Sequence, residues 1–130
     1  MQVAKKLSTE EFRNIVSFEK ITKNHPIDCI TKDECVYFLV DGKKIGTITG
    51  KNGMNIKTLS KIINRPVQII GIEKDVEKTI KGMIPYVKQL EMDKNVITAY
   101  VEYPVSGKRA QIAKEIVEKY FNAELKLIRY

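Results

Sequence analysis

Apolar residues recur every three or four positions near the start of the chain, which predicts an amphipathic helix. The expected core-facing stripe consists of Phe12, Ile15 and Val16. Ser8 and Glu11 are spaced as in a capping box, so the helix is expected to begin there. It should end before Pro26, because the residue ahead of a proline disfavours the helical region.

Two runs rich in β-branched and aromatic residues follow, at 27–31 and 35–40. They predict an antiparallel hairpin with a polar loop of three residues. In this register Thr31 faces Cys35, so the sulfurs of Cys29 and Cys35 do not lie opposite each other. Both cysteines are therefore expected to be buried, reduced thiols.

The middle of the chain has helical spacing that is broken by glycines. A short helical turn is expected over 43–49 and a second helix over 54–64, with Gly50-Lys51-Asn52-Gly53 between them. A strand over 66–72 completes this half. The apolar residues expected on the buried side of the second helix are Ile56, Leu59, Ile62 and Ile63.

The second half repeats this pattern in a shorter form. We interpret the chain as two copies of one α/β unit, at 1–73 and 74–130. No Pro-, Gly- or Ser-rich linker separates the copies, so they are expected to pack together. The elements predicted in the second copy are a helix over 75–82, a strand over 96–103, an amphipathic helix over 107–121 and a closing strand over 124–129.

Size and composition fit a globular protein. The 130 residues are 43% hydrophobic and 30% charged, with a formal net charge of +7. No apolar run approaches the ~20 residues needed to cross a bilayer. Residues 1–6 lack the apolar segment of a secretory signal, so a cytoplasmic protein without membrane contact is expected.

The positive charge is concentrated in one part of the chain. Residues 42–72 contain no aspartate or glutamate and hold Lys43, Lys44, Lys51, Lys57, Lys61 and Arg65. Those six residues account for all but one of the seven net positive charges. A basic region focused in this way attracts phosphates, and the release of their counterions drives binding.

The glycine pair lies in the middle of this acid-free stretch. Without a Cβ, Gly50 and Gly53 adopt turns that other residues resist, and they let backbone pass close to a sugar-phosphate chain. The helix that begins near Met54 would present free N–H groups and a positive dipole end at the same place. The pattern therefore predicts a site for a phosphate-containing polymer.

The order strand, short helix, Gly50-Lys51-Asn52-Gly53, helix and strand resembles the KH domain, whose glycine loop clamps about four nucleotides. The leading helix and hairpin resemble the type II arrangement of that fold. Two such units, with the run from Gly42 to Lys57, resemble archaeal NusA-like transcription termination and antitermination proteins. The resemblance implies an α+β fold of two tandem KH domains, single-stranded RNA as the ligand, namely the nascent transcript, and RNA polymerase as a partner.

The residues expected to contact RNA lie in the loop and on its two flanking helices. The glycine loop would grip the backbone, the lysines would attract and neutralise phosphates, and two isoleucines would form the floor of a groove for bases. The full set is Lys43, Lys44, Ile48, Gly50, Lys51, Asn52, Gly53, Asn55, Ile56, Lys57 and Lys61.

The second unit departs from the pattern at the equivalent place. Only three residues, 104–106, separate its strand from Gly107, and the loop would read Gly107-Lys108-Arg109-Ala110. Alanine replaces the second glycine, and its Cβ would obstruct the close approach of a backbone. A degenerate domain is therefore expected, with at most a weak second RNA site at Gly107, Lys108 and Arg109.

Few features of the sequence support a catalytic function. His25 is the single histidine, and with two cysteines it cannot complete a zinc site. The sequence has no nucleophile motif and no Walker loop, so neither an enzyme nor a metal or other cofactor is expected. The Tyr37-Phe38 pair lacks the run of glycines and aromatics that an RRM carries.

Two alternatives stay open. A KH-type protein could serve the ribosome or its maturation, and co-purification with ribosomal subunits would favour that function. The KH surface could also dock on RNA polymerase through protein contacts alone, in which case affinity for RNA would be absent. Nothing in the sequence indicates an obligate dimer, so a monomer is expected.

Overall fold

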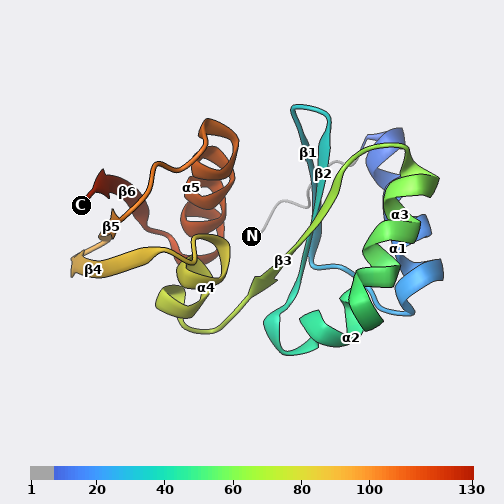
Figure 1. Ribbon diagram of the computed structural model, residues 1–130, viewed down its shortest axis with the longest axis horizontal. Coiled ribbons are helices and arrows are strands. Elements are labelled where there is room, and N and C mark those ends of the chain that lie inside the picture. The colour runs from blue at the N-terminus through green and yellow to red at the C-terminus, as the bar shows by residue number, and fades with distance from the viewer. Residues whose placement is uncertain (1–7) are drawn as a thin grey trace, which may run out of the picture. The chain divides into compact units, whose positions relative to one another are not determined.

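The structure is a computed structural model that describes residues 8–130 (Figure 1). Residues 1–7, on which the expectation of no secretory signal rests, lie outside the described part. The chain divides into two compact units, and the second begins at Glu73. Each unit contains a three-stranded mixed sheet and helices, which confirms the predicted α+β class. No helix in 8–130 is long and apolar enough to cross a membrane.

The first helix, α1 (Thr9–Thr22), begins as predicted with a capping box at Ser8. The Ser8 Oγ accepts a hydrogen bond from the Glu11 N–H at 3.1 Å, and Glu11 Oε1 accepts one from the Ser8 N–H at 3.2 Å. Two backbone donors that have no partner within the helix are thereby satisfied.

The predicted apolar stripe of α1 is wrong at Phe12, which is 59% exposed. The helix instead buries Asn14, Phe18 and Thr22, spaced four residues apart. Phe18 determines this orientation, because its ring packs against that of Phe38 with the centroids 4.5 Å apart. Ile15 is half-buried beside the same core.

The strands β1 (Asp28–Lys32) and β2 (Cys35–Asp41) form the predicted hairpin. Their turn has two residues rather than three, and both have positive φ, at 50° and 68°. Tight hairpin turns favour such left-handed residues because their twist matches that of the strands. The predicted register is therefore wrong by one position, since Cys35 faces Lys32 and not Thr31.

The rest of the first unit carries the chain from β2 back to a parallel partner strand. β3 (Val67–Ile72) pairs with β2, so the sheet order is β1-β2-β3 with one antiparallel and one parallel pair. This order fits the type II arrangement predicted from the sequence. The connecting elements are the short 3-10 helix η1 (Gly42–Lys44), α2 (Ile45–Thr49), the 3-10 turn η2 (Lys51–Gly53) and α3 (Met54–Ile63).

The core of the first unit lies between its sheet and helices α1 and α3. Leu59 of α3 is fully buried, and Ile56 and Ile63 pack half-buried around the same core. Ile62 was expected there but is 55% exposed, because it lies on the other flank of α3 from Ile56 and Ile63. The buried members of this core are Phe18, Cys29, Val36, Phe38, Val40, Ile48, Leu59 and Val67.

The second unit has one strand more than the sequence predicted. β4 (Val87–Asp93) was missed because most of its residues are polar and exposed. It pairs antiparallel with β5, and β5 pairs in parallel with β6. The short helix that precedes the loop in the first unit has no counterpart here, as predicted. The other elements are α4 (Val76–Met83), β5 (Val96–Val101), α5 (Gly107–Phe121) and β6 (Glu124–Arg129).

Candidate nucleic-acid interface

The loop Gly50–Gly53 joins α2 to α3 through a conformation that glycine alone adopts readily. Gly50 ends α2 with φ 77° and ψ 172°, a combination that is essentially restricted to glycine. Its N–H donates to the Gly46 carbonyl at 3.2 Å, and its own carbonyl accepts from the Gly53 N–H at 3.1 Å. The turn is therefore closed by backbone hydrogen bonds on both sides of Gly50.

Asn55, in the first turn of α3, holds this loop from the inside. Its side-chain Nδ2 donates to the carbonyl of Ile48 at 3.0 Å. A Cβ added to Gly50 would lie 3.0 Å from the Asn55 Cγ, so the carboxamide packs directly on the glycine. Asn55 was predicted as an RNA contact, and the structure places its amide donor within the loop.

Gly53 has a different environment from Gly50. It has φ 69° and follows Asn52, which has φ 57° and ψ 28°, so two left-handed residues lead into α3. A Cβ added to Gly53 would meet no atom within 4 Å. The backbone at Gly53 is thus open to approach from outside, as a clamp on a polymer backbone requires.

The N-terminus of α3 has no side-chain cap. Gly53 is its N-cap residue, whereas Ser8, Asp75 and Ser106 each cap a helix by accepting a backbone N–H hydrogen bond. The first turn of a helix carries N–H groups without partners in the helix, together with the positive end of its dipole. The Gly53 and Met54 N–H groups already donate to the carbonyls of Gly50 and Lys51, so an anion here would meet the dipole end and the N–H groups that follow Met54.

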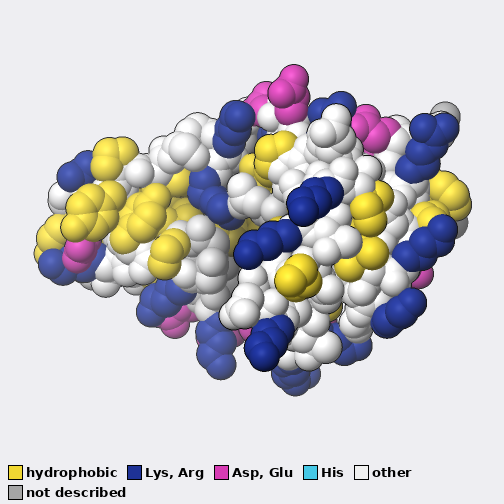
Figure 2. All heavy atoms as spheres, turned by 45° about the vertical axis from the view of Figure 1, so that its right-hand side comes forward, with side chains coloured by type: hydrophobic (Ala, Val, Ile, Leu, Met, Phe, Trp, Pro, Cys, Tyr) yellow, Lys and Arg dark blue, Asp and Glu magenta, His cyan; other side chains and the backbone are white. Residues whose placement is uncertain are grey.

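The basic residues predicted from the sequence are exposed around this loop. Lys43, Lys44, Lys51, Lys57 and Lys61 are exposed, and none forms an ion pair with another described residue. Arg65 differs, because its Nε lies 3.0 Å from Glu10 Oε1 of α1. Figure 2 shows lysine and arginine side chains spread over this unit with hydrophobic side chains between them.

Of the two isoleucines predicted to form a floor for bases, only one reaches the surface. Ile48 is 1% exposed and belongs to the core, so its side chain supports α2 from beneath the surface. Ile56 is half-buried. Met54 is 59% exposed directly after the loop. It was not predicted as a site residue, because an apolar residue at the start of an amphipathic helix is usually part of the core.

The predicted second loop does not exist as a loop. Gly107, Lys108 and Arg109 form the first turn of α5, and the Ser106 Oγ caps that helix by accepting from the Arg109 N–H at 3.2 Å. A Cβ added to Gly107 would meet no atom within 4 Å, as at Gly53, but here a side chain already occupies the helix end. The expectation of a degenerate glycine loop is therefore corrected to a capped helix start.

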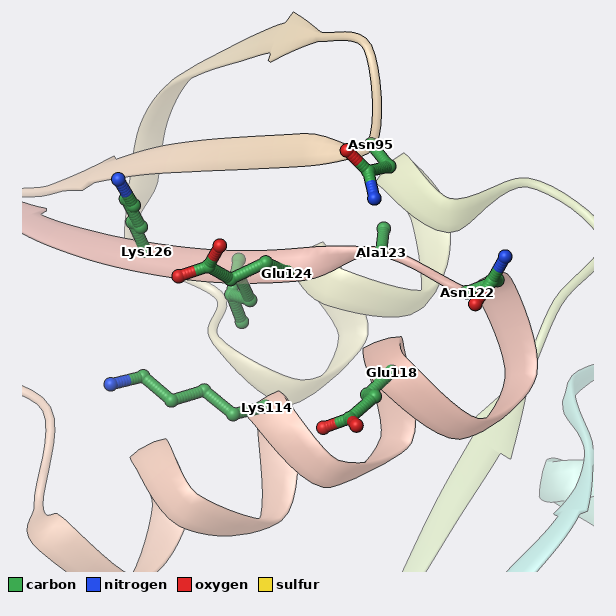
Figure 3. Close-up of a pocket in the computed structure, with 8 residues that line it drawn as sticks. Asn95, Lys114, Glu118, Asn122, Ala123, Glu124 and Lys126 are labelled. Atoms are coloured by element: carbon green, nitrogen blue, oxygen red, sulfur yellow. The ribbon is translucent and has the colours of Figure 1, made fainter.

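A surface pocket of about 480 Å³ lies in the second unit, and none of the predicted site residues lines it (Figure 3). Lys114 and Glu118 of α5 line one side, and Glu124 and Lys126 of β6 line the other. Charges of both signs on each wall give the pocket no preference for an anion.

The histidine and the two cysteines, the other residues with reactive side chains, lie in surroundings that a structural role explains. His25 Nδ1 lies 3.3 Å from Glu19 Oε2 on the surface. Cys29 and Cys35 are buried thiols that form no disulfide, as predicted. Within 8–130, no group of three or more His, Cys, Asp and Glu side chains is placed to hold a metal ion.

Comparison with known proteins supports the resemblance predicted from the sequence. No family model matches the chain. Two proteins described as "Probable transcription termination protein NusA" match over 78 residues, 60% of this chain: that of Methanocaldococcus jannaschii at 37% identity and that of Methanococcus vannielii at 33%. Over those 78 residues this chain is similar to NusA proteins.

The match to these NusA proteins covers 43% and 45% of their lengths, so the chain corresponds to less than half of each. The crystal structure of APE1850 aligns with 95% of this chain and 100% of its own, with a TM-score of 0.73 and 22% identity. That likeness establishes the fold. The two tandem sheet-and-helix units fit KH-like domains, as predicted.

Proposed function

We propose that this NusA-like chain is a factor of transcription termination that holds single-stranded RNA at Gly50-Lys51-Asn52-Gly53. The observation that carries the proposal is the open backbone at Gly53. It lies at the uncapped N-terminus of α3, among five lysines that have no carboxylate partner in the described part of the chain. The names of the NusA relatives support the role in termination.

The loop would bind the sugar-phosphate backbone rather than particular bases. A phosphate beside Gly53 would accept hydrogen bonds from N–H groups in the first turn of α3 beyond Met54, and the Lys51 ammonium would neutralise its charge. Lys57 and Lys61, one turn apart on α3, would contact the phosphates that follow. Lys43 and Lys44 would steer the strand toward the loop.

The bases would lie beside the half-buried Ile56 and the exposed Met54. Contacts of this kind tolerate many sequences, because every base presents an apolar face. We infer that the strand is the nascent transcript and that RNA polymerase is the protein partner, since a termination factor acts on both. The proposed role is binding, and none of its steps requires a cofactor.

The decisive variant is Lys51→Asp with Asn52→Asp. Residue 52 is left-handed, a conformation that aspartate tolerates, so the fold should survive. The chain offers a matched control, because Lys94-Asn95 in the β4–β5 turn is the same dipeptide and Lys94 is also left-handed, with φ 56°. Changing Lys94 and Asn95 to aspartate alters the net charge by the same amount.

Fluorescence anisotropy of a labelled single-stranded RNA measures both variants. The loop variant should bind at least about tenfold more weakly than wild type, while the control should bind within about twofold of it. Equal affinities for the wild type and the loop variant would overturn the proposed site. Absence of binding by the wild type would instead favour a module that docks on RNA polymerase by protein contacts alone.

A further inference from the structure

Three tyrosines lie at one end of the sheet in the second unit. Tyr86 precedes β4, Tyr103 follows β5 and Tyr130 follows β6. The strand register brings these three positions to the same end of the sheet. Tyr103 and Tyr130 are 60% and 66% exposed, and Figure 2 shows hydrophobic side chains gathered over this unit, at the left of the view.

Neighbouring residues hold the two exposed rings in place. The Tyr86 ring meets Tyr103 edge to face, with the centroids 5.9 Å apart and the planes at 81°. The Tyr86 hydroxyl donates to the Pro104 carbonyl at 3.3 Å, which fixes the segment that carries Tyr103. The Lys88 ammonium lies 4.7 Å from the centroid of the Tyr130 ring. Both rings are therefore ordered while remaining open to solvent.

The charge around these rings is positive. The segments that meet here, 86–88, 102–109 and 128–130, hold four basic residues and one acidic residue, Glu102. Glu102 is already paired, because its Oε1 lies 3.7 Å from the Lys88 Nζ. Exposed aromatic rings among cations are the combination with which proteins bind single-stranded nucleic acids.

The geometry points to a second RNA site on this unit, in which bases stack on Tyr103 and Tyr130 while Lys108 and Arg129 attract the phosphates. Such a site needs no glycine loop, which fits a unit whose α5 has a capped N-terminus in its place. The inference rests on the proposed function, since single-stranded RNA is the ligand of both sites. A stacking site would extend the length of strand that one chain holds.

The test uses the full chain with Lys51→Asp and Asn52→Asp, so that the first loop no longer binds. Labelled oligouridine at low salt should still bind this variant. Adding Tyr103→Ala and Tyr130→Ala should weaken the residual binding about tenfold, and the corresponding Phe substitutions should restore it, because phenylalanine keeps the ring. An abasic oligomer of the same length should bind no better to the tyrosine-containing chain than to the alanine variant.

A matched control is Met92→Ala, which removes a 62% exposed apolar side chain from the opposite end of β4 and should leave RNA binding unchanged. Circular dichroism checks the fold, and Tyr→Leu replacements keep apolar bulk if the alanine variant unfolds. Residual binding that survives loss of both rings overturns the inference. A loop variant that binds like wild type, with binding lost in the tyrosine variants, overturns the first site only.

Discussion

The side-chain amide of Asn55 donates a hydrogen bond to the carbonyl of Ile48 at 3.0 Å, and this bond ties the last turn of α2 to the first turn of α3. Ile48 is anchored in the core, so the bond connects the exposed loop to the rigid part of the first unit. The proposed RNA site thus depends on a residue that need not touch RNA.

Replacing Asn55 with alanine should lower the free energy of unfolding by about 1 kcal/mol, the usual worth of one partly buried hydrogen bond. RNA affinity should fall several-fold, because the loop loses its inner support. Chemical denaturation and anisotropy measure the two effects, with Asn95→Ala in the second unit as the control. If Asn55 acts through the loop, its effect on affinity should disappear in a Gly50→Ala background; an undiminished effect there would indicate a direct RNA contact.

The two loop glycines should respond differently to alanine. At Gly50 the new Cβ meets Asn55 and the backbone conformation resists any side chain, so a loss of about 2–3 kcal/mol in the free energy of unfolding is expected. At Gly53 the Cβ meets nothing, and only the left-handed φ opposes it, at about 1 kcal/mol.

Gly53→Asn sharpens this comparison, because asparagine tolerates the left-handed region. The variant should unfold within about 1 kcal/mol of wild type and yet bind RNA at least about tenfold more weakly, since its side chain would occupy the space left for the strand. Wild-type affinity in a folded Gly53→Asn protein would show that RNA does not approach this backbone.

Glu10→Gln should strengthen RNA binding. The substitution releases Arg65, whose Nε is 3.0 Å from the Glu10 carboxylate, and so adds one free cation to the basic region. Affinity at low salt should rise about two- to fivefold, and the dependence of binding on salt should steepen by up to ~0.7 in log–log slope. Stability should change little, because an exposed ion pair is worth about 0–1 kcal/mol.

The control for this charge change is Glu77→Gln in α4, which releases Lys81 from an equivalent exposed pair at 3.1 Å. It should leave the affinity unchanged, because Lys81 belongs to neither proposed RNA site. An equal increase in both variants would mean that net charge, rather than the position of Arg65, governs binding.

The order of elements in the first unit could be predicted because local signals agree there. The capping box at Ser8, the β-branched strands and the Gly50–Gly53 break each mark an element boundary within a few residues of sequence. The hairpin register failed because its turn uses two left-handed residues that are not glycine or asparagine. β4 was missed because it is an edge strand. Most of its residues are polar and exposed, so they lack the apolar pattern that predicts a strand.

The features of the candidate site that could not be predicted from the sequence depend on residues far apart in the chain or on packing. Arg65 is neutralised by Glu10, which lies 55 positions earlier, so it does not add to the free positive charge. Asn55 binds a carbonyl seven residues away on another helix, which no periodicity predicts. Ile48 has the same apolar character whether buried or lining a groove, and only the packing of α2 places it in the core.

The central claim is that RNA contacts the backbone of the glycine loop and the N-terminus of α3. Heteronuclear NMR of the isotope-labelled chain, titrated with a short single-stranded RNA, observes those amides directly. The largest shift changes should fall on residues 50–57, where the N-terminus of α3, the two glycines and two lysines coincide. Binding that shifts amides elsewhere and leaves residues 50–57 unchanged would contradict the proposed site.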